Sequence, residues 1–309
     1  MSRGSGRLSV AIISAASLTV RVIGPATRPA YKDVPAPDVG TDAQVMAWIM
    51  DTYSMQVGFA SPGVVTGKPL SIGGSLGREE ATGRGVVYVT LEAMKQLRLD
   101  PKKATVAIQG FGNVGSHTAR IMHEIGAKVV AVSDVTGGLY NKNGLDVPKL
   151  LAASKDKVRP LRESKLGDAI TNEDLLQLDC TVLVPAALSE QITAKNAAKV
   201  RCKILAEGAN GPTTLEADEI LREKGVFIIP DILANSGGVI VSYFEWVQDV
   251  QRFFWKEQDI RDRLKEIITS AFHRTMEFSK KQKSGMRMAA LMSGIDQVAK
   301  AHLARGLYP

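Results

Sequence analysis

The chain has 309 residues, of which 45% are hydrophobic and 23% charged, and its formal net charge is +7. This composition is that of a globular protein of about two domains, and two cysteines, Cys180 and Cys202, exclude a disulfide framework and favour a reducing, cytoplasmic setting. Lysine and arginine are interleaved with acidic residues, which disfavours nucleic-acid binding, and no Cys/His cluster indicates a metal site.

The first 31 residues combine a basic start, MSRGSGR, with the mostly apolar run LSVAIISAASLTV. That order is typical of a secretory signal. However, Arg21 follows the run directly, no clear cleavage site is present, and the run is too short to span a bilayer. We therefore interpret residues 1–31 as an N-terminal extension, either a strand or a poorly ordered segment, and expect no membrane association.

The next part of the chain predicts a helix, a long loop and a second helix. Residues 41–53 carry apolar side chains at helical spacing, with Thr41 or Asp42 as the N-cap. The Gly-rich residues 61–85 predict a loop with at most one short strand, and residues 84–97 predict a helix.

From Ala104 the chain alternates strands and helices. The stretch ATVAIQGFGNVGSHTARIMHEIGAKVVAVSD predicts a βαβ unit. Three later apolar runs, CTVLVPAA, CKILAEGAN and VFIIPDILANSG, alternate with helices predicted at 193–200 and 215–224. Strands buried on both faces have this pattern, so we expect an α/β fold with a doubly wound, Rossmann-type parallel sheet. From about Val239 to the end, helices dominate.

A glycine turn inside the βαβ unit predicts a dinucleotide site. Gly110, Gly112 and Gly115 have G-x-G-x-x-G spacing, directly after the predicted strand 105–109 and at the start of a helix. Such a turn brings backbone N–H groups at a helix N-terminus to a pyrophosphate. Asp134 ends the next strand, where a carboxylate accepts hydrogen bonds from ribose, which favours NAD. NADP stays open, because such a position tolerates a 2′-phosphate when a basic residue lies nearby.

The carboxyl ends of the other predicted strands should line the same crevice. Small residues there, Ala186 and Ala187, leave room for a nicotinamide. Asn210 and Asn235 offer amide donors and acceptors, although by spacing alone either is equally well a turn residue.

Five motifs in order, PAPDVGTD, GGSLGREEATGRGV, GFGNVG, AEGANGPTT and NSGGVIVSYFEWVQ, resemble glutamate dehydrogenase of the Glu/Leu/Phe/Val amino-acid dehydrogenase superfamily. The resemblance runs from about Val34 to the C-terminus. It implies reversible, NAD- or NADP-dependent oxidative deamination of L-glutamate to 2-oxoglutarate and ammonium, by a homo-oligomer that is a hexamer in full-length relatives. A sister enzyme that acts on leucine, phenylalanine or valine is the alternative within the superfamily.

The resemblance also implies roles for individual residues. Asp38 matches the catalytic aspartate, which shuttles protons to and from the substrate nitrogen, and the prolines at 35 and 37 would hold it on an extended segment. The implied substrate contacts are Arg78, Asn210 and Ser242. The implied cofactor contacts are Thr82, Gly110, Gly112, Asn113, Val114, Gly115, Asp134, Ala186, Ala187, Asn210 and Asn235.

The implied domains are a remnant of the substrate domain at 32–78, a dinucleotide-binding domain at 79–235, and C-terminal helices at 236–309 that return to the substrate domain. Relatives also carry a Gly-rich lysine motif upstream of the catalytic aspartate. Here the first lysine is Lys32, and Lys68 does not match that motif. We therefore expect that the chain lacks most of the N-terminal substrate domain and that its activity is weakened.

Two consequences follow from the missing lysines. One is an alternative function, a non-catalytic dinucleotide-binding fragment or a regulatory paralogue. The other concerns the C-terminal helices, which would either expose apolar side chains or pack on one another or on the first 78 residues. The side chains in question are Phe253, Phe254, Trp255, Met286, Met288 and Leu291.

Overall fold

The computed structural model describes residues 34–38, 40–154 and 160–306. Residues 1–31, which we interpret from the sequence as an N-terminal extension, are not among the described residues. The chain divides into two compact units: unit 1 comprises Met1–Glu79 and Gly238–Arg263, and unit 2 comprises Glu80–Gly237 and Leu264–Pro309. The segment 236–309 is thus divided between the two units, within helix α11 (Glu257–Gln282).

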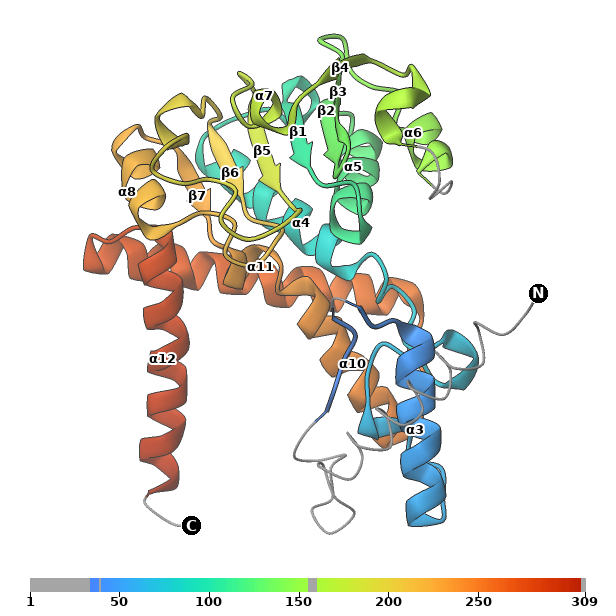
Figure 1. Cartoon of the computed structure of the whole chain (residues 1–309). Helices are drawn as coiled ribbons and strands as arrows, with labels where there is room; N and C mark the ends of the chain where they lie inside the picture. Colours follow the sequence, from blue (N-terminus) through green and yellow to red (C-terminus); the bar gives the residue numbers. More distant parts are fainter. Residues whose placement is uncertain (1–33, 39, 155–159, 307–309) are drawn as a thin grey trace, which may run out of the picture. The chain divides into compact units, whose positions relative to one another are not determined.

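Unit 2 contains a seven-stranded sheet of order β4-β3-β2-β1-β5-β6-β7 (Figure 1). Strands β2, β1, β5, β6 and β7 run parallel, in the order of a doubly wound fold. The strands are β1 Thr105–Gln109, β2 Lys128–Asp134, β3 Gly137–Tyr140, β4 Asp168–Ile170, β5 Val182–Pro185, β6 Ile204–Ala206 and β7 Phe227–Ile229. The predicted Rossmann-type sheet is confirmed for these five strands.

At one edge of the sheet, two strands depart from the parallel arrangement. β3 pairs antiparallel with β2, and β4 pairs antiparallel with β3. β2 and β3 are joined by only Val135 and Thr136, and a connection this short can link antiparallel strands only. Gly137 has φ +132°, which the tight reversal requires and a side chain would disfavour.

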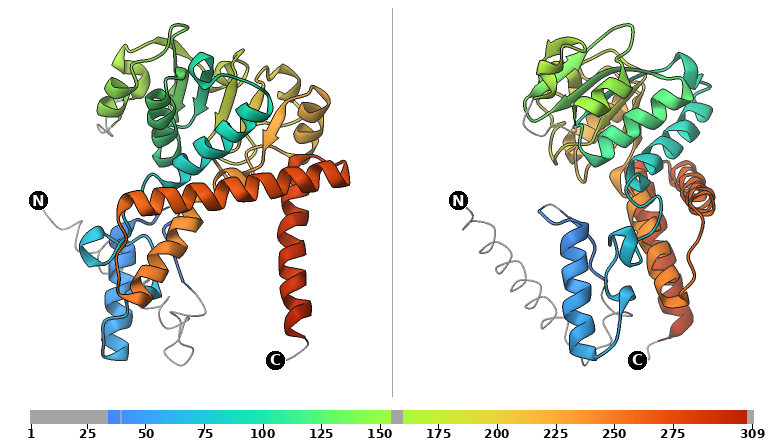
Figure 2. Two further views of the ribbon diagram at one scale, coloured as in Figure 1. Left: turned by 180° about the vertical axis from the view of Figure 1, so that it is seen from behind. Right: turned by 90° about the vertical axis from the view of Figure 1, so that its right-hand side faces the viewer.

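Helices cover both faces of the sheet. α4 (Ala81–Gln96) and α5 (Asn113–Ile125) pack on one face, and α7 (Asn172–Leu176) and α8 (Leu215–Glu223) pack on the other (Figure 2). Unit 2 also contains α6 Val147–Ala153, α9 Asp231–Ala234, α12 Met286–Arg305 and the part of α11 from Leu264 onwards. Its 3₁₀ turns include η4 Pro101–Lys103, η5 Leu161–Ser164 and η6 Ala197–Lys199.

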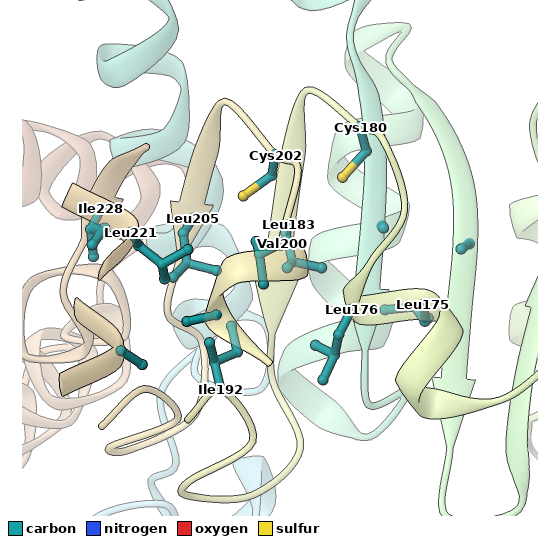
Figure 3. Packing of buried hydrophobic residues seen from close by; sticks show 14 residues of the cluster. Leu175, Leu176, Cys180, Leu183, Ile192, Val200, Cys202, Leu205, Leu221 and Ile228 are labelled. Carbon is teal, nitrogen blue, oxygen red and sulfur yellow. The ribbon is translucent and has the colours of Figure 1, made fainter. Parts of the chain in front are cut away.

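A buried cluster beneath α7 and α8 forms one half of the core of unit 2 (Figure 3). Leu183 and Leu205 of neighbouring strands pack there against Leu175, Ile192 and Leu221. Each has 0 or 1% of its surface exposed. Burial of a leucine or isoleucine side chain contributes roughly 1.5–3 kcal/mol, so this layer holds the strand ends in place.

The predicted helix at 193–200 is wrong, whereas that at 215–224 is confirmed by α8. Only η6 forms in the first segment. The Asn196 side chain accepts from the backbone N–H of Thr193 and donates to the carbonyl of Gln191. In addition, Lys224 Nζ donates to the carbonyls of Ala198 and Val200, so long-range contacts replace the helical ladder.

Unit 1 contains α3 (Ala43–Val57) and α10 (Gly237–Gln251), the latter beginning one residue before the division between the units. Asp42 is the N-cap of α3, and its side chain accepts a hydrogen bond from the N–H of Val45. Of the two predicted N-caps, Thr41 and Asp42, the structure therefore selects Asp42. Met46, Ile49 and Tyr53 of α3 form a small core with Val64 and Val65, which follow in the loop. That loop holds η2 (Pro62–Val64) and η3 (Leu70–Ile72) and, over its described residues 61–80, no strand.

Four of the six apolar side chains considered for exposure in the C-terminal helices are indeed exposed, namely Phe253, Phe254, Met288 and Leu291. Met286 is buried, and Trp255 is half-buried with its ring against Phe244. Within the described residues, every helix is too short or too polar to cross a bilayer.

Candidate functional site

The glycine turn of unit 2 is so tight that two of its positions require glycine. Gly110 has φ +91°, and a Cβ there would lie 2.7 Å from the carbonyl oxygen of Ala186. A Cβ at Gly115 would lie 1.8 Å from the carbonyl oxygen of Gly110, so α5 can approach the turn only with glycine at this position. At Gly112, the N-cap of α5, a Cβ would meet open space. The backbone at Gly112 is therefore open to a ligand.

This turn lies at the point where the order of the parallel strands reverses. β2 lies on one side of β1 and β5 on the other, and ligands of doubly wound folds bind between the loops that follow two such strands. The backbone N–H of Ala186 donates to the carbonyl of Gln109 at 2.7 Å. A Cβ at Gly208, after β6, would lie 3.0 Å from the Ala186 Cβ and 3.2 Å from a methyl of Val114. The structure thus brings together the predicted residues after β1, β5 and β6.

Asp134 is held firmly at the end of β2. Its Oδ1 accepts from the N–H and the hydroxyl of Thr136 at 2.7 and 2.6 Å, and its Oδ2 accepts from the N–H of Leu161 at 3.1 Å. Two carboxylate oxygens have about four acceptor sites, so capacity remains for a ribose hydroxyl. Arg162 and Thr136 both line a cavity of about 460 Å³.

Hydrogen bonds link Asp134 to the glycine turn. The N–H of Gly110 donates to Ser133 Oγ at 3.4 Å, and that hydroxyl donates to Asn172 Oδ1 at 2.6 Å. Asn172 Nδ2 in turn donates to the Asp134 carbonyl at 3.1 Å. Sequence reasoning did not single out Asn172, which lies 38 residues beyond Asp134 in the chain.

Asn210 and Asn235 lie side by side. Asn235 Nδ2 donates to Asn210 Oδ1 at 2.6 Å, so the loops after β6 and β7 meet at this pair. Thr82 lies in the first turn of α4 and is half-buried. Of the remaining predicted cofactor residues, Ala187 lies next to Gly110, because a Cβ on Gly110 would be 2.9 Å from its nitrogen. Asn113 is the first residue of α5.

In unit 1, Asp38 lies on an extended segment that packs against the loop after α3. Its N–H donates to Thr41 Oγ1 at 2.8 Å, and its carbonyl accepts from the Thr41 N–H at 2.9 Å. A Cβ at Gly67 would lie 2.4 Å from Pro37, and the N–H of Thr66 donates to the Pro35 carbonyl. These contacts hold the backbone of Asp38, whose side chain is exposed.

Two predicted substrate residues meet in unit 1. Arg78 Nε donates to Ser242 Oγ at 2.8 Å. Burial lowers the pKa of the Arg78 guanidinium, an effect that the charge of Glu245 opposes. A partly buried guanidinium beside a serine hydroxyl is a suitable partner for a carboxylate.

Beside this pair lies a buried ionic cluster that sequence reasoning missed. Lys68 Nζ contacts Glu245 and Asp249, each at 2.7 Å, and donates to the Val65 carbonyl at 2.8 Å. All three charged side chains have 0% of their surface exposed. The only sequence signal is that two acids lie four residues apart within an otherwise apolar helix. Lys68 is therefore engaged in structure, in agreement with its poor match to the family's catalytic lysine.

The sheet order and the glycine turn define a Rossmann-type protein, a fold in which dinucleotides bind at the switch point. The family model "Glutamate/Leucine/Phenylalanine/Valine dehydrogenase" matches residues 73–306. A second model, "Glu/Leu/Phe/Val dehydrogenase, dimerisation domain", matches residues 7–55. That match includes much of the segment 1–31, for which the sequence analysis had no counterpart.

Individual relatives point to the same family as the two family models. The chain is 54% identical to a glutamate dehydrogenase of Thermotoga maritima over 93% of this chain and 68% of the relative. It is 48% identical to the catabolic NAD-specific glutamate dehydrogenase RocG of Bacillus subtilis, over 97% of this chain and 68% of the relative. The chain therefore belongs to the Glu/Leu/Phe/Val dehydrogenase family and spans about two thirds of the length of these relatives.

Solved structures show the same architecture. The hetero-hexameric glutamate dehydrogenase of Thermus thermophilus superposes with a TM-score of 0.89 at 36% identity, over 96% of this chain and 69% of the other. The glutamate dehydrogenase of Plasmodium falciparum superposes with a TM-score of 0.87 at 27% identity, over 96% of this chain and 66% of the other.

Proposed function

We propose that the chain carries out the NAD(P)-dependent oxidative deamination of L-glutamate to 2-oxoglutarate and ammonium, and its reversal. The observation that carries this proposal is the glycine turn at the switch point. It occurs in a chain 54% identical to a glutamate dehydrogenase. The relatives' names supply the substrate class, and the arrangement of the residues supports it.

The residues present fit a nicotinamide dinucleotide. We propose that the first N–H groups of α5, at Asn113 and Val114, bind the pyrophosphate, since the side of the turn at Gly112 is open. Asp134 would accept from a ribose hydroxyl, and Asn210 with Asn235 would contact the nicotinamide end. When bound, the dinucleotide supplies the hydride acceptor.

We propose NAD as the preferred coenzyme, because a 2′-phosphate next to the Asp134 carboxylate would be repelled. Arg162 and Thr136 line the same cavity, so the guanidinium of Arg162 is a cation near the end of β2. Such a cation is the feature that would favour NADP instead. Affinities for NADH and NADPH, measured by fluorescence titration, decide between the two coenzymes. An equal affinity for both would overturn the preference for NAD.

For the substrate, we propose that Arg78 and Ser242 bind the side-chain carboxylate of glutamate. The guanidinium is already oriented by its bond to the serine hydroxyl, so it loses little conformational freedom on binding. Replacement of Ser242 by alanine should raise the KM for glutamate more than that for leucine. An equal effect on both amino acids would favour a sister dehydrogenase instead.

We propose that Asp38 moves protons to and from the substrate nitrogen. Its backbone is fixed by Thr41 and by the packing of Pro37 on Gly67, so the carboxylate starts from a defined position. A carboxylate within hydrogen-bond reach of the substrate nitrogen can accept a proton from it and return one to it.

A second candidate is dinucleotide binding without turnover, which the engagement of Lys68 in a buried ionic cluster favours. A spectrophotometric assay of NADH formation by the purified chain with glutamate and NAD separates the two. Turnover that vanishes in Asp38→Asn establishes the enzyme. NADH binding without turnover leaves the binding function alone, and the absence of both refutes the proposal.

We further propose that the chain self-associates, since a structural neighbour is hetero-hexameric and one matching model describes a dimerisation domain. Light scattering during gel filtration measures the assembly, and a monomer at all concentrations would contradict it. The expected cytoplasmic location stays a prediction.

A further inference from the structure

A second ionic cluster, in unit 2, joins the start of α12 to the carboxyl edge of the sheet. Arg287 Nη2 contacts Glu207 at 2.6 Å, its Nε contacts Asp218 at 2.8 Å, and its Nη1 contacts Asp231 at 3.4 Å. These acids come from three separate elements: the end of β6, helix α8 and the first turn of α9. One guanidinium thus connects four parts of unit 2.

Two of these acids also shape the loops after β6 and β7. The N–H of Asp231 donates to Glu207 Oε2 at 2.9 Å, and the N–H of Gly211 donates to Asp231 Oδ2 at 2.7 Å. Asn210 precedes Gly211 directly, and Asn235 ends α9 and bonds to Asn210. The positions of both asparagines therefore depend on the Glu207 and Asp231 carboxylates.

The cluster holds three carboxylates against one guanidinium, and Glu207 has 0% of its surface exposed. Burial raises the pKa of Glu207, and the bond to Arg287 opposes this effect. Burial alone would lower the pKa of Arg287, but the bonds to Glu207 and Asp218 raise it above its ordinary value. Without Arg287, a buried carboxylate would lose its cation and would face two further acids.

The pyrophosphate turn is held by other contacts. Gly115 packs on the Gly110 carbonyl, and a Cβ at Gly83 of α4 would lie 2.8 Å from the Val114 carbonyl. The two ends of the crevice are therefore supported independently, one by close backbone packing and the other by Arg287.

We propose that Arg287 is a positioning residue for the nicotinamide end of the dinucleotide. It fixes the loops that carry Asn210 and Asn235, while the ADP half of the coenzyme is bound without its help. The inference rests on the proposed dinucleotide binding. It assigns to the C-terminal helix α12 an indirect part in coenzyme recognition.

The test compares the full chain with Arg287→Met and a control, Arg120→Met. Arg120 also bridges two carboxylates of unit 2, Glu80 and Glu124, but on α4 and α5. Affinity is measured for NADH by its fluorescence and for ADP-ribose, which lacks the nicotinamide, by calorimetry. Arg287→Met should weaken NADH about tenfold, the equivalent of one or two lost hydrogen bonds, and leave ADP-ribose within about threefold. Arg120→Met should not produce this selective loss.

Hydrogen exchange of the ligand-free chains gives a second readout. In Arg287→Met, exchange should accelerate at 207–211 and 231–235 but not at 110–115. If Arg287→Met does not fold, Arg287→Lys keeps the charge without the three-way contact and should show a smaller, equally selective loss.

Equal weakening of both ligands, or of neither, would overturn the inference. So would unchanged exchange at 207–211. The unaltered chain is measured first. If it binds neither NADH nor ADP-ribose, the proposed dinucleotide binding itself is refuted.

Discussion

Replacement of Lys68 by methionine would test the buried ionic cluster of unit 1. The ammonium lies 2.7 Å from each of two carboxylates, on Glu245 and Asp249, and none of the three side chains is exposed. Methionine has a similar length and keeps the packing but removes the charge. Two buried carboxylates would then remain without their cation.

The expected cost follows from this burial. Removal of one partner from a buried ion pair destabilises a protein by about 3–5 kcal/mol, because the other charge is left desolvated. Glu245 Oε2 and Asp249 Oδ1 have no hydrogen-bond partner, and the backbone N–H of residue 68, 3.2 Å from Glu245 Oε1, is a weak substitute for the ammonium. We expect the free energy of unfolding of unit 1 to fall by about 3–5 kcal/mol at pH 7. The loss should shrink in acid, because burial raises the pKa of Asp249 to about 6 and its protonated form needs no cation.

Tryptophan fluorescence is a selective assay for this unit. All three tryptophans, Trp48, Trp246 and Trp255, lie in unit 1, so urea unfolding followed by their emission reports on the unit that changes. Arg261→Met is the matched control, since its pair with Glu257 lies in the same unit but is partly exposed, and should cost at most about 1 kcal/mol. A cost for Lys68→Met no larger than that of the control, or one that does not diminish in acid, would refute the reasoning.

Three further predictions concern the glycine turn, Asp249 and the two cysteines. Gly112→Ala should leave stability nearly unchanged and weaken NADH binding at least tenfold. Gly115→Ala should in addition destabilise unit 2 by about 1–3 kcal/mol, because only a Cβ at Gly115 meets backbone. Equal unfolding midpoints for the two variants would contradict this. Burial raises the pKa of Asp249 to about 6, so its protonated form is favoured in the folded state and the free energy of unfolding falls as pH rises from about 4 to 6. Asp249→Asn should abolish that fall, which is at most roughly 3 kcal/mol, and an unaltered pH profile would disprove the assignment. Burial raises the pKa of the Cys202 thiol to about 12, and it raises the pKa of the Cys180 thiol as well. A thiol reagent at mildly alkaline pH should therefore modify both cysteines only after unfolding. Rapid modification of the folded chain would show that the thiols are accessible.

Much of the nucleotide-binding half followed from local patterns. The β1 strand, the turn at Gly110 and the end of β2 at Asp134 lie where the sequence predicts them. This success has a physical reason: strand burial, glycine freedom and helix starts are properties of residues close together in the chain. The same holds for α8 and for the N-cap at Asp42.

What only the tertiary structure decided depends on residues far apart in the chain. The antiparallel edge strands and the loss of the helix at 193–200 result from pairings that no local period records. The Lys68 cluster joins residues 177 and 181 positions apart, and Arg287 reaches Glu207 across 80. From the sequence alone, a charged residue is expected on the solvent-exposed surface. It becomes a buried ion pair only when folding brings its partner to it, because an isolated charge is too costly to bury.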